Sequence, residues 1–301
     1  MMRQGNIRWR PSRRAILLLG LTALTTAVAA DARQFGDWGR AFNAESLPTS
    51  SNQLNTSSND GCPILDPYDK SLYMASNRPG GHGGLDIWIA PWTGNGWGTP
   101  VNAGPEINTA ADEFCPDPVR GNRLFFVRRS SSTNTDIYVA KHLPQRGFQT
   151  PERLPTGDNS INSPAEEWSP SWFEADGHEY LYFSSTREGR QRIYYSVDFG
   201  PAQLAPGGVN SSAADARPNV RRDGLEIVWD STRFGTLGGT DIWTATRSTV
   251  DQPWGTAVHL ENGINSSAGE SRASLSWDGS RLMFGTTRPG EGSADIWTAT
   301  R

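Results

Sequence analysis

The sequence is poor in several features that define common protein classes. Of its 301 residues only two are cysteines and two are lysines, and no apolar run after residue 30 is long enough to cross a membrane. No segment after residue 30 has apolar residues spaced by three and four, so no substantial helix is expected. Neither a Gly-x-Ser-x-Gly motif nor a P-loop occurs, and the four histidines lack the spacing of metal ligands.

The first 30 residues differ from the rest of the chain. Five arginines precede the apolar run 15–30, which ends in a small-x-small sequence at residues 27–29. This order predicts a secretory signal peptide over residues 1–30, and residues 12–17 also fit a twin-arginine signal loosely. The remaining chain is then expected in the periplasm of a bacterium or outside the cell. Without those five arginines the formal charge of −4 becomes about −9, which argues against a nucleic-acid partner.

What the sequence does contain is a unit of about 54 residues that occurs five times. Each copy has an Asn, an acid five residues later, an apolar strand that ends near an Arg and, in four copies, Asp-Ile-Trp or Asp-Ile-Tyr. The five acids are Asp60, Glu113, Glu167, Asp215 and Glu270, and their matching arginines are Arg78, Arg129, Arg187, Arg233 and Arg288. Abundant glycine, proline and tryptophan fit short strands joined by tight turns.

The last copy stops after its third expected strand, and a fourth-strand pattern stands at the other end of the chain, at residues 38–41. A single blade leaves two edges and both faces uncovered, so closing the ring with a borrowed strand is favourable. The sequence therefore predicts an all-β, five-bladed β-propeller over residues 31–301, with four-stranded antiparallel blades and the N-terminal strand closing the ring. The repeats are expected near 31–54 plus 266–301, 55–107, 108–161, 162–209 and 210–265.

Several of these motifs resemble the WD40-like β-propeller repeat family, whose repeats form the propeller domain of TolB. The matching segments are Ser76-Asn77-Arg78-Pro79-Gly80-Gly81, Gly84-Leu85-Asp86-Ile87-Trp88 and Ser276-Trp277-Asp278-Gly279, followed by Leu282-Met283-Phe284. The resemblance covers about residues 35–301 and implies a propeller fold. It implies little about function, because propellers serve as enzymes, receptors and scaffolds, and five units differ from the six of TolB.

The five acids are expected to form a ring at the entrance of the central channel, because the first strand of a blade is innermost. One interpretation is a set of carboxylates for glycoside hydrolysis, with Glu113, Asp117 and Glu167 as candidate catalytic residues, or a seat for calcium in the channel. The other is five structural ion pairs with the matching arginines, since unpaired like charges would raise each other's pKa. A residue repeated five times does not supply the different roles of a catalytic site. The structural interpretation is therefore preferred, and no catalytic residue, cofactor or metal is assigned.

Function on a repeat scaffold is expected where the copies differ. Because strand residues alternate sides, those two and four residues after each acid should face the channel. The first position reads Cys62, Cys115, Ser169, Arg217 and Arg272, and the second reads Ile64, Asp117, Ser171, Asn219 and Ser274. The candidate ligand-binding residues are Arg217, Arg272, Asp117, Ser169 and Asn219. Two neighbouring guanidinium groups suit a carboxylate, sulfate or phosphate, although they could instead neutralise the acids.

The two cysteines, Cys62 and Cys115, share one position on neighbouring inner strands. In an oxidising compartment they could form a disulfide if their Cα atoms come within about 4.4–6.8 Å. The alternative is a pair of small buried thiols.

Two functions are open. The first is a monomeric, exported, non-catalytic propeller that binds an anionic glycan, a cell-wall fragment or a protein segment of the cell envelope at the channel mouth. The alternative is a glycan-active hydrolase or lyase that uses inner-strand carboxylates. The pairing of the acids separates the two, because arginine-bound acids leave no general acid or base, whereas two unpaired acids roughly 5–10 Å apart would supply them.

Overall fold

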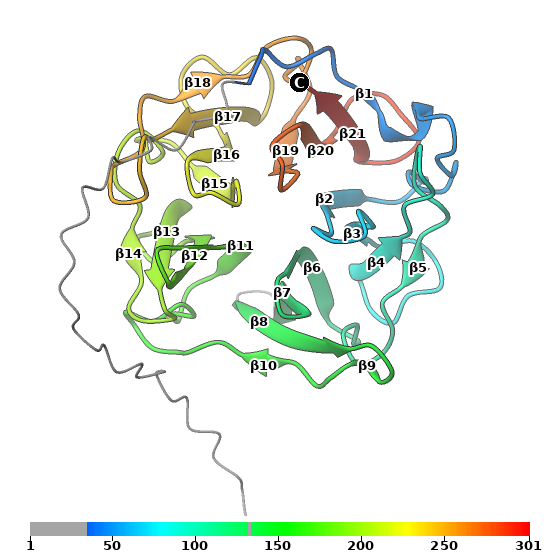
Figure 1. Ribbon diagram of the computed structural model, residues 1–301, viewed down its shortest axis with the longest axis horizontal. Helices are drawn as coiled ribbons and strands as arrows, with labels where there is room; N and C mark the ends of the chain where they lie inside the picture. Colours follow the sequence, from blue (N-terminus) through cyan, green and yellow to red (C-terminus); the bar gives the residue numbers. More distant parts are fainter. Residues whose placement is uncertain (1–34, 132–133) are drawn as a thin grey trace, which may run out of the picture. The chain divides into compact units, whose positions relative to one another are not determined.

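The computed structural model describes residues 35–131 and 134–301, so the expected signal peptide at 1–30 lies outside the described residues. Within Phe35–Arg301, five antiparallel sheets radiate around a central axis (Figure 1). The prediction of an all-β, five-bladed propeller is confirmed. The helical content of the described residues is a single turn, η1 (Ala44–Ser46).

Each sheet forms one blade, and the first strand after each repeated Asn lies nearest the axis (Figure 1). Blade 1 consists of β2 (Asp60–Leu65), β3 (Leu72–Ser76), β4 (Asp86–Ala90) and β5 (Val101–Asn102). Blade 2 consists of β6 (Asp112–Val119), β7 (Arg123–Ser131), β8 (Asn134–Leu143) and β10 (Glu152–Arg153), with the short β9 (Gly147–Phe148) also paired to β8. Blade 3 consists of β11 (Glu167–Ala175), β12 (His178–Ser185), β13 (Arg192–Val197) and β14 (Gln203–Leu204). Blade 4 consists of β15 (Asp215–Val220), β16 (Glu226–Ser231), β17 (Asp241–Thr246) and β18 (Val258–His259).

Blade 5 is completed by the N-terminal segment. Its strands are β19 (Glu270–Leu275), β20 (Arg281–Thr286), β21 (Asp295–Thr300) and β1 (Phe42–Asn43). β1 runs antiparallel to β21 with Phe42 opposite Thr298, and the guanidinium of Arg301 binds the carboxylate of Glu226 in blade 4 at 2.6 and 2.8 Å. The same guanidinium lies 4.1 Å from the ring centre of Phe35. Both ends of the described chain are therefore anchored in the ring.

The repeated Asn joins each blade to the preceding one. In blade 2, the carboxamide of Asn108 accepts a hydrogen bond from the backbone N–H of Ile87 at 2.8 Å and donates one to its C=O at 2.9 Å. The other copies make the same two bonds, in the pairs Asn55–Ile296, Asn162–Ile137, Asn210–Ile193 and Asn265–Ile242. A carboxamide carries both a donor and an acceptor, so it can satisfy both backbone groups of one residue.

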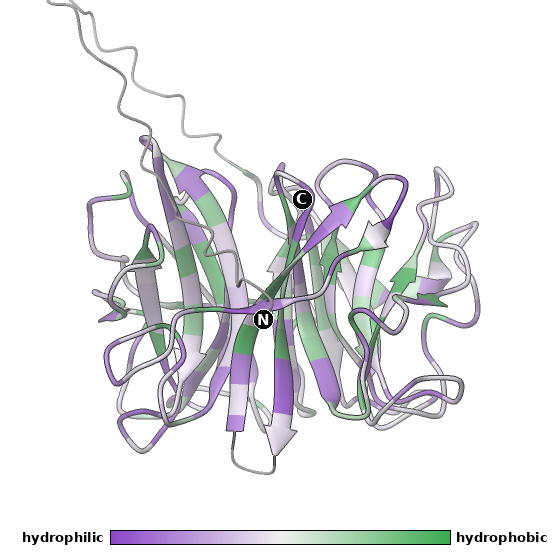
Figure 2. Cartoon of the chain, turned by 90° about the horizontal axis from the view of Figure 1, so that it is seen from below, coloured by the Kyte–Doolittle hydropathy of each residue, from purple (hydrophilic) through white to green (hydrophobic). Residues whose placement is uncertain are grey.

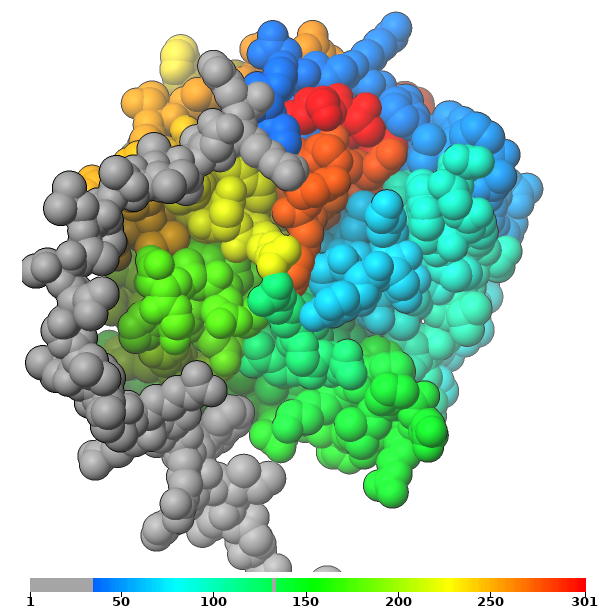
Figure 3. All heavy atoms as spheres, in the orientation of Figure 1, coloured from blue at the N-terminus to red at the C-terminus, as the bar shows by residue number. Residues whose placement is uncertain are grey.

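Apolar side chains fill the contacts between blades. The largest completely buried side chains are aromatic, and several of them lie on second strands, among them Phe125, Tyr182, Trp229 and Phe284. The strands carry most of the hydrophobic residues, while the loops at both ends are mostly hydrophilic (Figure 2). Side chains fill much of the central gap between the ribbons (Figure 3). Any site on the axis must therefore be small.

Candidate functional site

Each inner strand contains a β-bulge directly after its acid. The residue two positions after the acid has a positive φ in every blade, between 47° and 58°, at Cys62, Cys115, Ser169, Arg217 and Arg272. The pairing with the second strand shifts register at the same place, for example between Gly61 and Ile64. Two inner-strand residues then oppose one partner, which interrupts the alternation of sides.

A cavity of about 30 Å³ lies on the axis, between the five inner strands. We call it the channel cavity. It is lined by Cys62, Pro63, Ile64, Cys115, Pro116, Ser169, Pro170, Arg217, Pro218, Asn219, Arg272, Ala273 and Ser274. None of the five repeated acids is among these residues. The expectation that the acids ring the channel is therefore wrong, because the bulge turns them away from the side on which the following residues face the axis.

The acids instead stabilise the loops that lead into the inner strands. All five are completely buried. Asp60, for example, accepts hydrogen bonds from the backbone N–H and the hydroxyl of Thr56 at 2.7 and 2.8 Å, and pairs with Arg78 at 2.6 Å. Equivalent ion pairs join Arg187 to Glu167, Arg233 to Asp215 and Arg288 to Glu270.

Blade 2 uses a different arginine from the one expected. Glu113 pairs with Arg128 at 2.7 Å, while Arg129 pairs with the neighbouring Asp112 at 2.9 Å. The expected pair of Glu113 with Arg129 is therefore wrong. The reason is that Arg128 stands directly opposite Glu113, at the position where the other blades have Ser or Thr.

The three inner-strand carboxylates considered for catalysis have little access to a substrate. Glu113 and Glu167 are two of the five completely buried acids that form ion pairs with arginines. Burial raises the pKa of Glu167. Asp117 is 4% exposed, and its Oδ2 accepts the backbone N–H of Trp172 in blade 3 at 2.7 Å. Burial raises the pKa of Asp117 to about 8, so the group is protonated in neutral solution.

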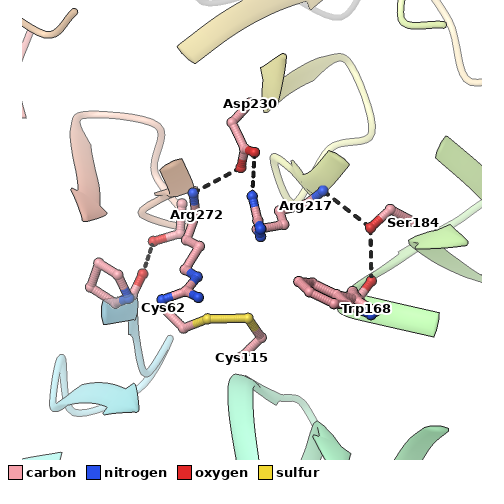
Figure 4. The surroundings of a disulfide bond; sticks show 9 residues. Cys62, Cys115, Trp168, Ser184, Arg217, Asp230 and Arg272 are labelled. Carbon is pink, nitrogen blue, oxygen red and sulfur yellow. Dashed lines mark hydrogen bonds and ion pairs between the residues drawn. A yellow bond between two sulfur atoms is a disulfide. The ribbon is translucent and has the colours of Figure 1, made fainter. Parts of the chain in front are cut away.

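Asp117 belongs to a ring of links between neighbouring inner strands. The residue four after the acid makes the link at four of the five junctions. The bonds are Trp172 N–H to Asp117 (2.7 Å), Val220 N–H to Ser171 (2.9 Å), Leu275 N–H to Asn219 (2.8 Å) and Ser274 hydroxyl to Pro63 C=O (2.6 Å). Between blades 1 and 2 this position holds Ile64, which has no polar side-chain atom. There the Cys62–Cys115 disulfide joins the strands, with the Cα atoms 4.8 Å apart (Figure 4).

Arg217 and Arg272 reach the channel cavity from blades 4 and 5 (Figure 4). Arg217 Nη1 binds Oδ2 of the buried Asp230 at 2.5 Å, and the backbone N–H of Arg272 donates to Oδ1 of the same carboxylate at 2.9 Å. Among the described residues the guanidinium of Arg272 has no hydrogen-bond acceptor, and Nε is buried. Ser169 also lines the cavity, and its hydroxyl, on a side chain 7% exposed, likewise lacks a described partner.

Calcium does not fit this lining. Calcium requires six to eight oxygen ligands, usually with several carboxylates, whereas the channel cavity presents two guanidinium groups and no carboxylate. Residues 35–131 and 134–301 contain no group of three or more His, Cys, Asp or Glu that could hold a metal ion.

A second pocket, of about 130 Å³, lies at the turns between first and second strands. We call it the turn-face pocket, and it is lined by Arg120, Trp172, Glu174, Ala175, Asp176, Gly177, Arg222 and Trp277. The guanidinium groups of Arg120 and Arg222 lie 5.8 and 4.8 Å from the ring centre of Trp277. The exposed Tyr68 lies 6.3 Å from the same ring. Glu174 and Asp176 are exposed and form no ion pair with any described residue.

The turn-face pocket is not among the sites predicted from the sequence, although the repeat contains a signal for it. Four lining residues stand seven positions after the acid of their own copy, and the copies there read Pro67, Arg120, Glu174, Arg222 and Trp277. No two neighbouring copies agree at this position. The copies therefore differ at this position, as they do at the positions two and four residues after the acid, where the candidate ligand-binding residues are found.

The chain matches no protein-family model and no curated protein. Several solved structures are similar to it in fold. A GH62 α-L-arabinofuranosidase catalytic domain from Coprinopsis cinerea is 11% identical, with 88% of this chain and 96% of that chain covered and a TM-score of 0.56. A thermostable family-43 glycoside hydrolase is 18% identical over 84% of this chain and 91% of that chain, with a TM-score of 0.55. A putative TolB from Agrobacterium tumefaciens is 17% identical over 83% and 79%, with a TM-score of 0.49.

These comparisons correct one expectation and leave another open. The expectation of a non-catalytic binding propeller is contradicted, because the similar structures are mostly glycoside hydrolases. At these identities the likeness itself shows only the fold. Membership of the WD40-like repeat family is not confirmed, since no family model matches. Within the described part of the chain, no helix has the length and apolar character needed to span a membrane.

Proposed function

We propose that this chain is an exported glycan-active hydrolase whose substrate binds in the turn-face pocket. The observation that carries the proposal is the pair of exposed carboxylates, Glu174 and Asp176, in one pocket with the ring of Trp277 and the two arginines that lie near it. The five repeated acids are buried in ion pairs, whereas the carboxylates of Glu174 and Asp176 are exposed and can contact a ligand. The fold shared with family-43 and family-62 hydrolases supports the same proposal.

The aromatic residues suit a sugar ring. One face of a pyranose or furanose is formed largely by C–H groups, which pack against the face of an indole or phenol ring while the hydroxyls stay solvated or hydrogen-bonded. The ring centres of Trp277 and Tyr68 lie 6.3 Å apart with their planes tilted by 45°, so together they form an angled platform across the turns of blades 5 and 1. A chain of two or more sugar residues would fit this platform better than a single sugar.

The arginines favour an acidic glycan. Arg120 and Arg222 are exposed, come from blades 2 and 4, and form no ion pair with another described residue. A guanidinium binds a carboxylate through two parallel hydrogen bonds, so a uronic acid beside Trp277 would be recognised by charge as well as by stacking. The substrate class we propose is therefore a glycan that contains uronic acid residues.

The hydrolysis needs two carboxyl groups with different roles. One donates a proton to the glycosidic oxygen as the C–O bond breaks, and the other either removes a proton from the attacking water or itself attacks the anomeric carbon. Glu174, in β11, and Asp176, in the turn that follows, are the side chains of the turn-face pocket that can take these roles. Their separation in the substrate complex decides between inversion and retention at the anomeric carbon.

The test is product analysis with the purified protein. Polygalacturonate, glucuronoxylan, arabinan and unsubstituted xylan are incubated separately, and new reducing ends and product masses are measured. Glu174→Gln and Asp176→Asn should each lower kcat/KM on an acidic glycan by about 10²- to 10⁴-fold, the usual effect of losing a general acid or base.

The matched control is Glu152→Gln, which changes an exposed acid on the outer strand β10 and should leave kcat/KM within a factor of about two. Hydrolysis that survives both Glu174→Gln and Asp176→Asn would remove these residues from the mechanism. The absence of products from all four glycans would contradict the proposed activity.

A further inference from the structure

We infer that the channel cavity binds a small inorganic anion, held by the guanidinium group of Arg272 together with Arg217 and the hydroxyl of Ser169. The inference is independent of the proposed hydrolase activity, because the channel cavity and the turn-face pocket share no lining residue.

The first support is an imbalance of charge. Two guanidinium groups line the cavity, and one carboxylate, that of Asp230, which is not part of the lining, binds Arg217. Both oxygens of Asp230 are already used, Oδ2 by Arg217 and Oδ1 by the backbone N–H of Arg272. One carboxylate therefore faces two guanidinium groups, which leaves an excess of positive charge beside the cavity. Burial, followed by repulsion from Arg217, lowers the pKa of Arg272 to about 10, and at that pKa the group stays charged in neutral solution.

The second support is the way in which the chain directs these side chains into the cavity. Arg217, Arg272 and Ser169 all occupy the bulge position with positive φ, which aims the side chain at the axis. The guanidinium of Arg272 then passes over Gly61 of blade 1, where a Cβ would lie only 2.8 Å from Nη1. A Cβ at residue 61 would therefore force the end of the Arg272 side chain to shift.

The third support is unsatisfied hydrogen-bonding capacity. The hydroxyl of Ser169 and the Nε atoms of Arg217 and Arg272 are buried without an acceptor among the described residues. Buried polar groups are normally hydrogen-bonded, so groups left open around one cavity indicate a bound partner. All three open groups can donate, which selects an acceptor with negative charge.

The size of the cavity limits the ligand. About 30 Å³ holds a single small ion or a few water molecules but not a sugar ring. Guanidinium N–H groups bind halides and oxyanions, and they repel cations. Chloride and sulfate are therefore the probes to use.

The inference is tested by thermal unfolding of the purified protein at constant ionic strength. Sodium gluconate, whose anion is too large for the cavity, is replaced stepwise by chloride or by sulfate. Because the anion binds the folded state, Tm should rise with the logarithm of its concentration above Kd. Sulfate also stabilises proteins by exclusion from their surfaces, so the decisive comparison is between variants.

Two variants are compared with a control. Arg272→Gln removes the charge, and Gly61→Ala retains the charge but displaces the guanidinium. Each should weaken the apparent anion affinity at least tenfold. Arg222→Gln, which removes an arginine from the turn-face pocket, should respond like the unmodified protein. If Arg272→Gln does not fold, Gly61→Ala decides the question. Equal responses of Gly61→Ala and the unmodified protein, or no response to either probe anion, would overturn the inference.

Discussion

Removing the Cys62–Cys115 disulfide should lower the free energy of unfolding more than removing any other single link between inner strands. The bond closes a loop in which the two cysteines are 53 residues apart in sequence. For a loop of that length the chain-entropy model gives about 4 kcal/mol at 25 °C, because the unfolded chain is restricted. The other junctions are joined by single polar groups, and each hydrogen bond contributes about 1 kcal/mol.

The assay is urea unfolding of the Cys62→Ala/Cys115→Ala protein and of the unmodified protein, with and without a reductant. The double variant should lose about 4 kcal/mol, and the reduced unmodified protein should unfold at nearly the same urea concentration as the double variant. The control is Ser171→Ala, which removes the acceptor of the Val220 N–H and should cost about 1–2 kcal/mol. Reduced and oxidised protein with the same midpoint would refute the reasoning, because the covalent link would then contribute nothing to stability.

Three further predictions concern the acids and the turn-face pocket. Glu167→Ala should cost about 3 kcal/mol in a urea titration, because it leaves the guanidinium of Arg187 largely buried without its partner; an unchanged midpoint would show that Glu167 has no structural role. Asp117 has a pKa raised by burial to about 8 in the folded state, so its protonation stabilises the fold below about pH 4 and that contribution is lost as pH rises towards 8. Asp117→Asn should flatten this pH dependence, measured as Tm between pH 4 and 8, and an unaltered profile would contradict the assignment. Trp277→Ala should raise KM for an acidic glycan about tenfold or more with little change in Tm, since the ring is partly exposed, whereas an unchanged KM would exclude Trp277 from the binding platform.

The architecture could be predicted from the sequence because each copy of the repeat corresponds to one blade. Five copies of one unit, with a fourth-strand pattern displaced to residues 38–41, determine the number of blades and the closure at β1 and β21. The Asn of each copy forms the same two hydrogen bonds in every blade, so it recurs because each blade needs one carboxamide to bind the backbone of the preceding blade. Repeated residues are therefore the ones whose structural role can be inferred most safely.

The candidate site was harder to predict because the residue types at the bulge do not indicate a positive φ. A positive φ is usually taken as a sign of glycine or asparagine, yet here the residues are cysteine, serine and arginine. The assumption of unbroken alternation therefore placed the acids on the channel. The residues two positions after the acids do line the channel cavity, whereas of those four positions after the acids Asp117 and Ser171 do not. In blade 2 the presence of consecutive arginines, Arg128 and Arg129, hid which of them opposes Glu113.

The turn-face pocket could not be recognised from one blade alone. Its residues come from four different copies and lie close together only because the ring closes. The signal for it is that the copies differ seven residues after the repeated acid, a position that lies at or beyond the end of the first strand.

The closure of blade 5 also means that the order of the blades along the chain is not dictated by the fold. Residues 42–43 pair with β21, and Gly39 N–H binds the C=O of Thr300 at 2.8 Å, so the two ends of the described chain are adjacent. A short peptide could join them, and new ends could be opened in the segment between β14 and β15 without interrupting a blade (Figure 1). In such a circularly permuted protein the disulfide, the inter-blade links and both pockets would be retained, and each blade would consist of one continuous segment.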